Sequence, residues 1–318
     1  MTIHLTDGHT ELSFQYMQAE GNSETLLQFL LRRFRYLNES EWQQSIRQQR
    51  LWVDNRLGHP SQRLRNHQRV TYLRPDFLEP EVDEHFEVVY EDDLLIAFNK
   101  SGNLPTSPSG KYFKHTLVNL AKQRLGRETL LTLHRLDRET SGVVAFAKHK
   151  AAAQKMAEHF RNWRVHKTYQ AILSKPLTNA VTVDMPIGPA LDSAIRIKQA
   201  VTPQGKPSQT HFQPLEEIRG SQLVEVRPLT GRTHQIRVHA AYLGSPILGD
   251  KLYGLPDEGF LRWLEEGEAC LPMLGCVVCR QLLHASEIRF PHPDTGEKIV
   301  ICADNTNLLR DFSEGPEV

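Results

Sequence analysis

The stretch His134-Arg135-Leu136-Asp137-Arg138-Glu139-Thr140-Ser141-Gly142 decides how the rest of the chain is interpreted. Apolar residues precede it at 130–133 and follow it at 142–147, so one strand is predicted to enter a polar loop and another to leave it. Within the loop Asp137 lies between two arginines, whose positive charge favours the ionised carboxylate. A loop held by two core strands presents such a group rigidly, which makes Asp137 the candidate catalytic residue.

Three other interpretations of this loop are open on local chemistry alone. The charges fit a solvated turn with a surface ion pair. The catalytic loop of a protein kinase reads H-R-D followed by Asn, but here Leu136 intervenes and the chain has no glycine-rich phosphate loop or D-F-G. Asp137 and Glu139 also fit the acid and base of a glycosidase, although no second carboxylate motif accompanies them.

Charge is distributed unevenly along the 318 residues, although the formal net charge is zero. Residues 32–74 contain ten arginines and three acidic residues, ten minus three giving +7. Residues 76–93 then contain nine acidic residues and no Lys or Arg. A basic block of this kind attracts phosphates, so we expect the N-terminal part to contact nucleic acid.

Cysteine usage and hydropathy predict a reducing compartment. The N-terminus has no basic-then-apolar leader and no apolar run reaches membrane-spanning length, so we expect a cytoplasmic chain without membrane contact or structural disulfides. Cys276 and Cys279 have the spacing of half a zinc site. No second pair exists and the flanks are apolar, which favours buried thiols and predicts no metal.

The first 78 residues are expected to form a small basic module. Residues 1–20 show no clear period, whereas Ser23 and Ser40 precede helical patterns and strands are predicted at 51–53 and 69–73. This order resembles the small RNA-binding module of a ribosomal small-subunit protein; a basic helical cap on the main domain is the alternative. Residues 75–80 predict a linker, so we expect domains at 1–78 and 79–318.

The second domain is predicted to have irregularly interleaved helices and strands. Strands are expected at 86–90, 94–98, 167–173, 223–226, 282–285 and 299–302, and helices at 116–125, at 151–160 and beginning with Thr230 as N-cap. This order lacks the strand–helix alternation of a doubly wound sheet. It favours an α+β class with a mixed, largely antiparallel sheet flanked by helices and loops.

Five segments, in order over residues 85–303, together resemble the RluA-type RNA pseudouridine synthases. Residues 98–105 resemble the family's N-K-P-x-G-L-P loop, 134–142 its H-R-L-D-x-x-T-S-G signature, 167–169 its K-x-Y strand, 231–239 its G-R-x-H-Q-I-R-x-H helix, and 280–293 its closing strand. Ser101 stands where the family usually has proline, and Asn103 is also atypical. That loop supports the site without supplying the chemistry, so the expected activity is unaffected.

The resemblance implies the pseudouridine synthase fold and the isomerisation of specific uridines in RNA, with the target base flipped out and without metal or nucleotide cofactor. It implies that Asp137 acts at the ribose as nucleophile or base, that Arg232 pairs with it, and that Tyr169 stacks on the uracil. The residues it implies for RNA binding are Arg135 in the space left by the uridine, Leu283 beside the base, Lys167 and Arg237 at phosphates, and His234 in packing or RNA contact.

The expected partner is ribosomal or transfer RNA, and the chain is expected to act as a monomer. Two other function classes are considered. A catalytically idle RNA-binding or ribosome-assembly factor on the same fold would not need Asp137, Tyr169 and Arg232, which are all present. A carboxylate-based glycoside hydrolase would use Asp137 and Glu139.

Overall fold

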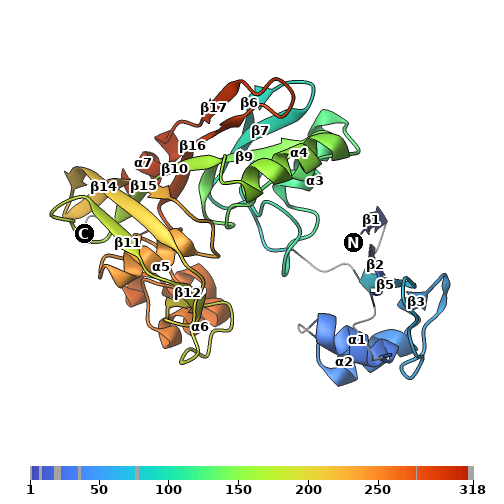
Figure 1. The fold of residues 1–318 in the computed structure, drawn as a ribbon. Helices are drawn as coiled ribbons and strands as arrows, with labels where there is room; N and C mark the ends of the chain where they lie inside the picture. Colours follow the sequence, from blue (N-terminus) through green and yellow to red (C-terminus); the bar gives the residue numbers. More distant parts are fainter. Residues whose placement is uncertain are drawn as a thin grey trace. The chain divides into compact units, whose positions relative to one another are not determined.

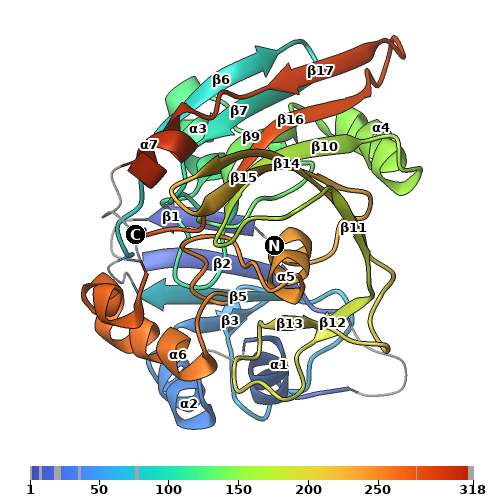
Figure 2. The same cartoon turned by 90° about the vertical axis from the view of Figure 1, so that its left-hand side faces the viewer.

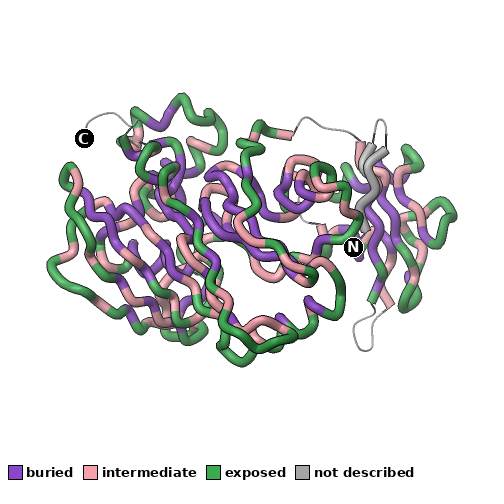
Figure 3. Tube along the Cα trace, turned by 90° about the horizontal axis from the view of Figure 1, so that it is seen from above, coloured by how far each residue is buried: buried purple, intermediate pink, exposed green. Residues whose placement is uncertain are grey.

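In the computed structural model the chain divides into two compact units, Met1–Glu79 and Pro80–Val318 (Figure 1). The structure describes residues 2–6, 9–17, 23–34, 37–75, 79–276 and 278–313. The predicted linker at 75–80 falls partly on residues 76–78, which lie outside this range. Figure 3 shows buried positions inside each unit, so each unit has its own core.

The N-terminal unit packs two helices against an antiparallel sheet. Within the described residues the sheet has the order β1 (Thr2–Thr6), β2 (His9–Gln15), β5 (Arg69–Pro75), β3 (Leu51–Val53), β4 (Arg56–Leu57), and the helices are α1 (Leu26–Arg33) and α2 (Glu39–Arg47). Aromatic rings join the two layers: the rings of Trp42 and Tyr72 are 5.0 Å apart, and those of Tyr16 and Phe29 are 5.4 Å apart. This aromatic core fixes both helices on one sheet face.

Residues 1–20 show no clear period in the sequence, but the described part of this segment forms β1 and β2, which extend the predicted strand pair to a five-stranded sheet. Leu12 and Phe14 point into the core at strand spacing, but Ser13 between them is also buried. Its hydroxyl lies 2.9 Å from the Thr71 hydroxyl on β5. A buried serine breaks the apolar–polar alternation by which a half-buried strand is recognised.

The helix starts in this unit also differ from the expected Ser23 and Ser40. Thr25 caps α1 and forms a capping box with Gln28, and Asn38 caps α2 and forms one with Glu41. In each box the cap side chain accepts from the third backbone N–H, and the third side chain accepts from the cap N–H. The helices themselves lie where the sequence places them.

The C-terminal unit is built on one mixed sheet, as the α+β prediction requires. Its strand order is β11 (Val181–Asp184), β14 (Gln209–Ile218), β15 (Ser221–Pro228), β10 (His166–Leu173), β16 (Leu283–Pro291), β9 (Ser141–Ala147), β7 (Leu95–Lys100), β6 (Phe86–Glu91), with β17 (Lys298–Cys302) on β16 and β8 (Leu131–Thr132) on β9. Figure 2 shows these strands following one another from β6 toward β11. Among the described pairings only β16–β9 is parallel, which confirms a largely antiparallel sheet.

Helices cover both faces of this sheet. One face packs against α3 (Leu117–Leu125) and α5 (Gln235–Tyr242), and the other against α4 (Lys150–Arg161) and α7 (Thr306–Ser313). Alternate residues of β7 divide between them, since Phe98 packs on the α3 side and Ala97 on the α4 side. A short strand pair, β12 (Ile187–Pro189) with β13 (Gln199–Val201), and helix α6 (Asp257–Glu266) complete the unit.

The helix expected to have Thr230 as its N-cap begins four residues later. His234 is its N-cap residue, with a left-handed φ of 56°, and its side chain makes no capping bond. The Thr230 hydroxyl instead donates to the side-chain oxygen of Gln235 over 2.7 Å. The same oxygen accepts from the backbone N–H of Arg232 over 3.0 Å, so residues 230–234 fold as a loop around the buried Gln235.

The parallel contact between β9 and β16 depends on Gly142. The register pairs His284 with Ser141 and Ala285 with Gly142, directly after the polar loop that carries Asp137. Gly142 has φ +106°, and a Cβ there would lie 2.2 Å from the carbonyl oxygen of Ala285. Only glycine permits both this backbone conformation and this approach.

Replacement of Gly142 by alanine is therefore expected to destabilise the C-terminal unit strongly. We expect Gly142→Ala to lower its free energy of unfolding by about 3 kcal/mol or more, because a left-handed backbone and a steric clash add up. Gly220→Ala is the matched control: φ is +74° and nothing lies within 4 Å of its Cβ, so about 1–2 kcal/mol is expected. Urea unfolding of both variants tests this, and equal losses would contradict it.

Candidate active site

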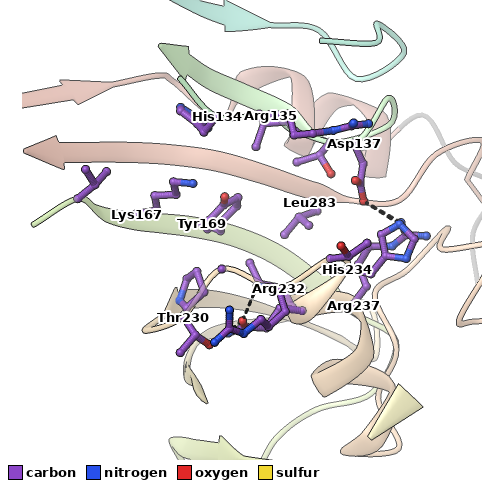
Figure 4. A pocket seen from close by; sticks show the side chains of 18 of the residues that line it. His134, Arg135, Asp137, Lys167, Tyr169, Thr230, Arg232, His234, Arg237 and Leu283 are labelled. Atoms are coloured by element: carbon purple, nitrogen blue, oxygen red, sulfur yellow. Dashed lines mark hydrogen bonds and ion pairs between the residues drawn. The ribbon is translucent and has the colours of Figure 1, made fainter. Parts of the chain in front are cut away.

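A recess of about 690 Å³ lies in the C-terminal unit and has the size of a small-molecule or nucleoside site. Its walls come from the loop before β9, the segment from the end of α4 into β10, the segment between β15 and α5, and the start of β16. All eight residues that the sequence singled out line it and are labelled in Figure 4: Arg135, Asp137, Lys167, Tyr169, Arg232, His234, Arg237 and Leu283.

The backbone on both sides of Asp137 is anchored to the core. The hydroxyl of buried Thr106 accepts from the N–H of Leu136 over 3.2 Å and donates to its carbonyl over 3.0 Å. On the other side the carbonyl of Arg138 accepts from the Lys100 ammonium over 3.1 Å. Burial holds the pKa of Lys100 well below its usual range. These bonds fix the backbone on both sides of Asp137 and so restrict the direction in which its side chain points.

The carboxylate of Glu139, two residues after Asp137, anchors the loop to neighbouring segments. Its carboxylate lies 2.9 Å from the Lys251 ammonium and 2.8 Å from the Arg138 guanidinium, and it accepts the backbone N–H of Gln281. Its side chain is only 13% exposed, so this carboxylate is already paired and cannot act as the second carboxylate of a glycosidase.

The Asp137 carboxylate is paired with Arg237. One guanidinium N–H of Arg237 donates to Asp137 over 2.8 Å, and two more donate to Asp250 over 2.7 and 2.9 Å. Exposure falls along the chain of charges, from 34% for the Asp137 side chain to 10% for Arg237 and 0% for Asp250. The exposed end of this network is therefore the oxygen that faces the recess.

The protonation state of the site follows from these contacts. Burial raises the pKa of Asp137, but the charge of Arg237 and its hydrogen bond to the carboxylate outweigh this effect and hold the pKa below its usual range. Burial alone would lower the pKa of Arg237, but the carboxylates of Asp250 and Asp137 have the larger effect, so its pKa lies above the usual value. Asp137 is thus ionised at neutral pH. The ionised Asp137 stabilises the folded state fully at pH values above the usual carboxyl pKa. This stabilisation is lost as the pH falls through the lowered pKa of Asp137 in the folded state.

The sequence-based pairing of Asp137 with Arg232 is wrong, and so is the phosphate role given to Arg237. Arg232 is turned away beside Thr230 in Figure 4, and its Nε donates to the Pro207 carbonyl over 3.1 Å. The reason is the loop at 230–234: with the helix starting at Gln235, Arg237 and not Arg232 is turned toward Asp137. The guanidinium of Arg237 is bonded to two carboxylates and is not free to bind phosphate.

Tyr169 and Leu283 form the apolar part of the wall near Asp137 (Figure 4). They are 8% and 4% exposed. Burial and the charge of Asp137 raise the pKa of the Tyr169 phenol above its usual value. The phenol is therefore neutral, and it offers a flat face and a proton rather than a base. Lys167 lies two residues earlier on β10, and burial lowers its pKa to about 8.

His234 completes the polar side of the recess, and Tyr253 contacts it there. The His234 ring Nδ1 lies 2.8 Å from the Tyr253 hydroxyl, and its Nε2 lies 3.9 Å from the Asp137 carboxylate. Burial, with the charge of Arg237, lowers the pKa of His234, which keeps the ring neutral. The Arg237 guanidinium also lies 5.0 Å from the centre of the Tyr253 ring. His234 is thus held by the protein, and its exposed edge faces Asp137.

The sequence interpretation missed Asp250 and Tyr253. They belong to Gly249-Asp250-Lys251-Leu252-Tyr253-Gly254, a polar turn bounded by glycines that follows an apolar segment. Asp250 also accepts the backbone N–H groups of Leu252 and Tyr253, so its carboxylate closes this turn while it binds Arg237. A glycine-bounded Asp at the end of an apolar run was the available signal.

The cysteines do not match the expectation of buried thiols. Cys270 is buried, but Cys276 is half-buried and Cys279 is exposed. Over the residues described, no three His, Cys, Asp or Glu side chains are grouped so as to hold a metal ion. Over the same residues, no helix combines the length and apolar character needed to cross a membrane.

Comparison with known proteins identifies relatives of this chain. Residues 94–242 match the family model described as RNA pseudouridylate synthase. An uncharacterized RNA pseudouridine synthase of Synechocystis sp. is 32% identical over 230 residues, which cover 72% of this chain and 79% of that protein. The ribosomal large subunit pseudouridine synthase C of Salmonella typhimurium is 38% identical over 226 residues, 70% of this chain and 67% of the relative. The structure of human RNA Pseudouridylate Synthase Domain Containing 1 has a TM-score of 0.56 at 30% identity and covers 71% of this chain and 86% of its own.

Removal of the Arg237 guanidinium should expose how much the site depends on it. We expect Arg237→Met to lower the free energy of unfolding by about 3–5 kcal/mol, because Asp250 is left buried and unpaired. It should also raise the pKa of Asp137. Arg232→Met, the matched control, should change stability by less than about 0.5 kcal/mol. Urea unfolding and carboxyl NMR titration measure both effects, and a larger loss for Arg232→Met would reverse the assignment.

Proposed function

This chain belongs to the RNA pseudouridylate synthase family, and we propose that Asp137 is the group through which it acts on the target uridine. The family relation makes it an isomerase that forms pseudouridine in RNA. The observation that carries the proposal is the paired, ionised carboxylate of Asp137, which opens on a recess large enough for a nucleoside.

The reaction exchanges one bond to the ribose for another. The bond between the uracil nitrogen and the ribose breaks, the base turns, and a bond from carbon forms in its place; substrate and product are isomers. Asp137 acts at the ribose as nucleophile or as base. Arg237 keeps it ionised, and Asp250 fixes the direction of Arg237, so that the carboxylate faces the base without reorganising.

The walls of the recess suit a uracil that has left the RNA stack. Extruding a base from a helix costs about a few kcal/mol, and a stacking face recovers part of it. Tyr169 supplies that face, and its neutral phenol retains a proton for the later steps. Leu283 packs beside the base and excludes water. Arg135 is exposed at the recess, where its guanidinium can occupy the space left by the uridine.

The proposed substrate is ribosomal RNA. Its support is that several relatives, including those of Salmonella typhimurium and Haemophilus influenzae, are ribosomal large subunit pseudouridine synthases. In the N-terminal unit exposed arginines fit the RNA-binding role expected for that unit. They are Arg32, Arg33, Arg47, Arg56, Arg63, Arg65 and Arg69. The groups assigned to the site come from one chain, so we propose that a monomer acts, in the cytoplasm.

Mapping of pseudouridines in total RNA, with and without the gene, tests this proposal. We expect the loss of one or more pseudouridines in large-subunit ribosomal RNA when the gene is absent, and their return with the wild-type gene. Loss confined to transfer RNA would keep the activity and change the substrate. An unchanged map would contradict the proposed function.

Asp137→Asn should abolish pseudouridine formation. We expect a loss of at least about 10³-fold in single-turnover rate, because the amide cannot act as nucleophile or base. The amide keeps the size of the carboxylate, so RNA binding and the melting temperature should change little. Asp192→Asn is a control on an exposed carboxylate outside the recess and should be fully active. A smaller loss of single-turnover rate in purified Asp137→Asn would refute the catalytic role of Asp137.

Replacement of three exposed arginines tests the N-terminal unit. We expect Arg56→Gln, Arg65→Gln and Arg69→Gln together to weaken RNA binding and to reduce the salt slope of log K by about one for each lost phosphate contact. Filter binding over a salt series measures the slope. Asp137→Asn keeps all three arginines and should keep the wild-type slope. An unchanged slope in the triple variant would show that these arginines do not contact RNA.

A further inference from the structure

The end of the recess formed by Phe160, Trp163 and Val165 is apolar and is not used by the chemistry assigned above. These residues and Leu133 line the recess together with the catalytic groups. Phe160 is already covered, since the His134 ring centre lies 6.1 Å from its own and the Lys167 ammonium lies 5.4 Å from its ring centre. Trp163 differs, because its side chain is 57% exposed.

The backbone presents the Trp163 indole outward. Trp163 directly follows the C-cap of α4 and has a left-handed φ of +56°, which bulky residues rarely adopt. Two hydrogen bonds fix this turn: the Trp163 N–H donates to the Phe160 carbonyl over 3.3 Å, and the Arg164 N–H donates to the His159 carbonyl over 2.9 Å. An ordered turn therefore holds a large apolar side chain mostly in solvent instead of in the core of the C-terminal unit.

The charges around Trp163 have one sign. Residues 161–167 contain Arg161, Arg164 and Lys167 and no acidic residue. Arg161 is 72% exposed and reaches Glu158 only at 4.0 Å. Lys167 faces the recess, and burial lowers its pKa to about 8. An exposed aromatic ring among basic side chains is how proteins hold an unpaired nucleotide, with the base on the ring and the phosphate on the cations.

The geometry relates this end of the recess to the uracil position. Lys167 and Tyr169 are two residues apart on β10 and so point to the same face, roughly 7 Å from each other. Tyr169 is the proposed stacking face for the flipped uracil. Lys167 thus stands between that position and the turn that carries Trp163, where a phosphate linking two neighbouring nucleotides would pass.

We propose that Trp163 stacks on an unpaired base of the substrate RNA next to the flipped uridine, and that Lys167 binds the phosphate between them. This subsite rests on the proposed function, since it needs RNA in the recess. It gives the enzyme a preference for uridines in single-stranded loops or bulges over those in continuous duplex, because a base within a duplex is not free to stack on the indole.

The test compares substitutions at Trp163 in the full chain, on unmodified total RNA from cells that lack the gene. We expect Trp163→Ala to lower kcat/KM for pseudouridine formation by about 5- to 100-fold, mainly through KM, with kcat kept. Trp163→Tyr should retain kcat/KM to within about threefold, whereas Trp163→Leu should resemble Trp163→Ala. The side chain is exposed, so folding is not at risk. Leu215→Ala, at a side chain 51% exposed and outside the recess, is the control and should match wild type.

A fluorescence measurement separates stacking from activity. A short single-stranded RNA carrying 2-aminopurine next to a uridine should be quenched when it binds the wild type, and not when it binds Trp163→Ala at saturation. Three results would each overturn the subsite alone, provided that the wild type is active. They are equal kcat/KM for Trp163→Ala and the wild type, equal rates for Trp163→Leu and Trp163→Tyr, and equal quenching by Trp163→Ala and the wild type. Absence of pseudouridine formation by the wild type would overturn the proposed function, and the subsite with it.

Discussion

One guanidinium bonded to two carboxylates sets the state of this site. Arg237 lies between Asp250, which is fully buried, and Asp137, which faces the recess. The buried carboxylate balances one positive charge in the interior and leaves the outer carboxylate ionised but only singly bonded to Arg237. Burying charged side chains costs free energy that is offset only when each charge is paired. The loss of any one of these three side chains would therefore affect the other two. The reactive oxygen is therefore oriented before any RNA arrives.

The loop that carries Asp137 is held by further buried polar side chains. Lys100 bonds its backbone, and Glu139 joins it to Lys251 on the turn that also holds Asp250. Ser101 has its own part in this support: its hydroxyl donates to the Asp83 carbonyl over 2.6 Å and its N–H donates to the His85 carbonyl over 3.2 Å. A proline at this position could make neither bond, so the departure from the family pattern has a structural use here.

Sequence reasoning located this site well and its pairwise contacts less well. The strands and helices followed from hydrophobic period, which is a local pattern. The set of lining residues followed from the resemblance of five segments to the family's motifs. The partner of Asp137 did not, because it depends on where α5 begins. The fold of residues 230–234 around Gln235 delays that start, and Arg237 then takes the position expected for Arg232. Asp250 was missed because a buried carboxylate in a turn has no periodic signature.

The parallel register of β9 with β16 has a consequence for how the site is assembled. Two residue pairs, Ser141 with His284 and Gly142 with Ala285, form the seam between the two halves of the large sheet. Asp137 belongs to the half that contains β9, whereas Tyr169 and Arg237 belong to the half that contains β10 and β15. Side-chain contacts also cross this seam: Glu139 binds Lys251 over 2.9 Å, and the Gln281 amide donates to the Thr140 hydroxyl over 2.6 Å. The Arg237–Asp137 bond spans the same seam, so the carboxylate meets its counter-ion only where both halves of the sheet are joined.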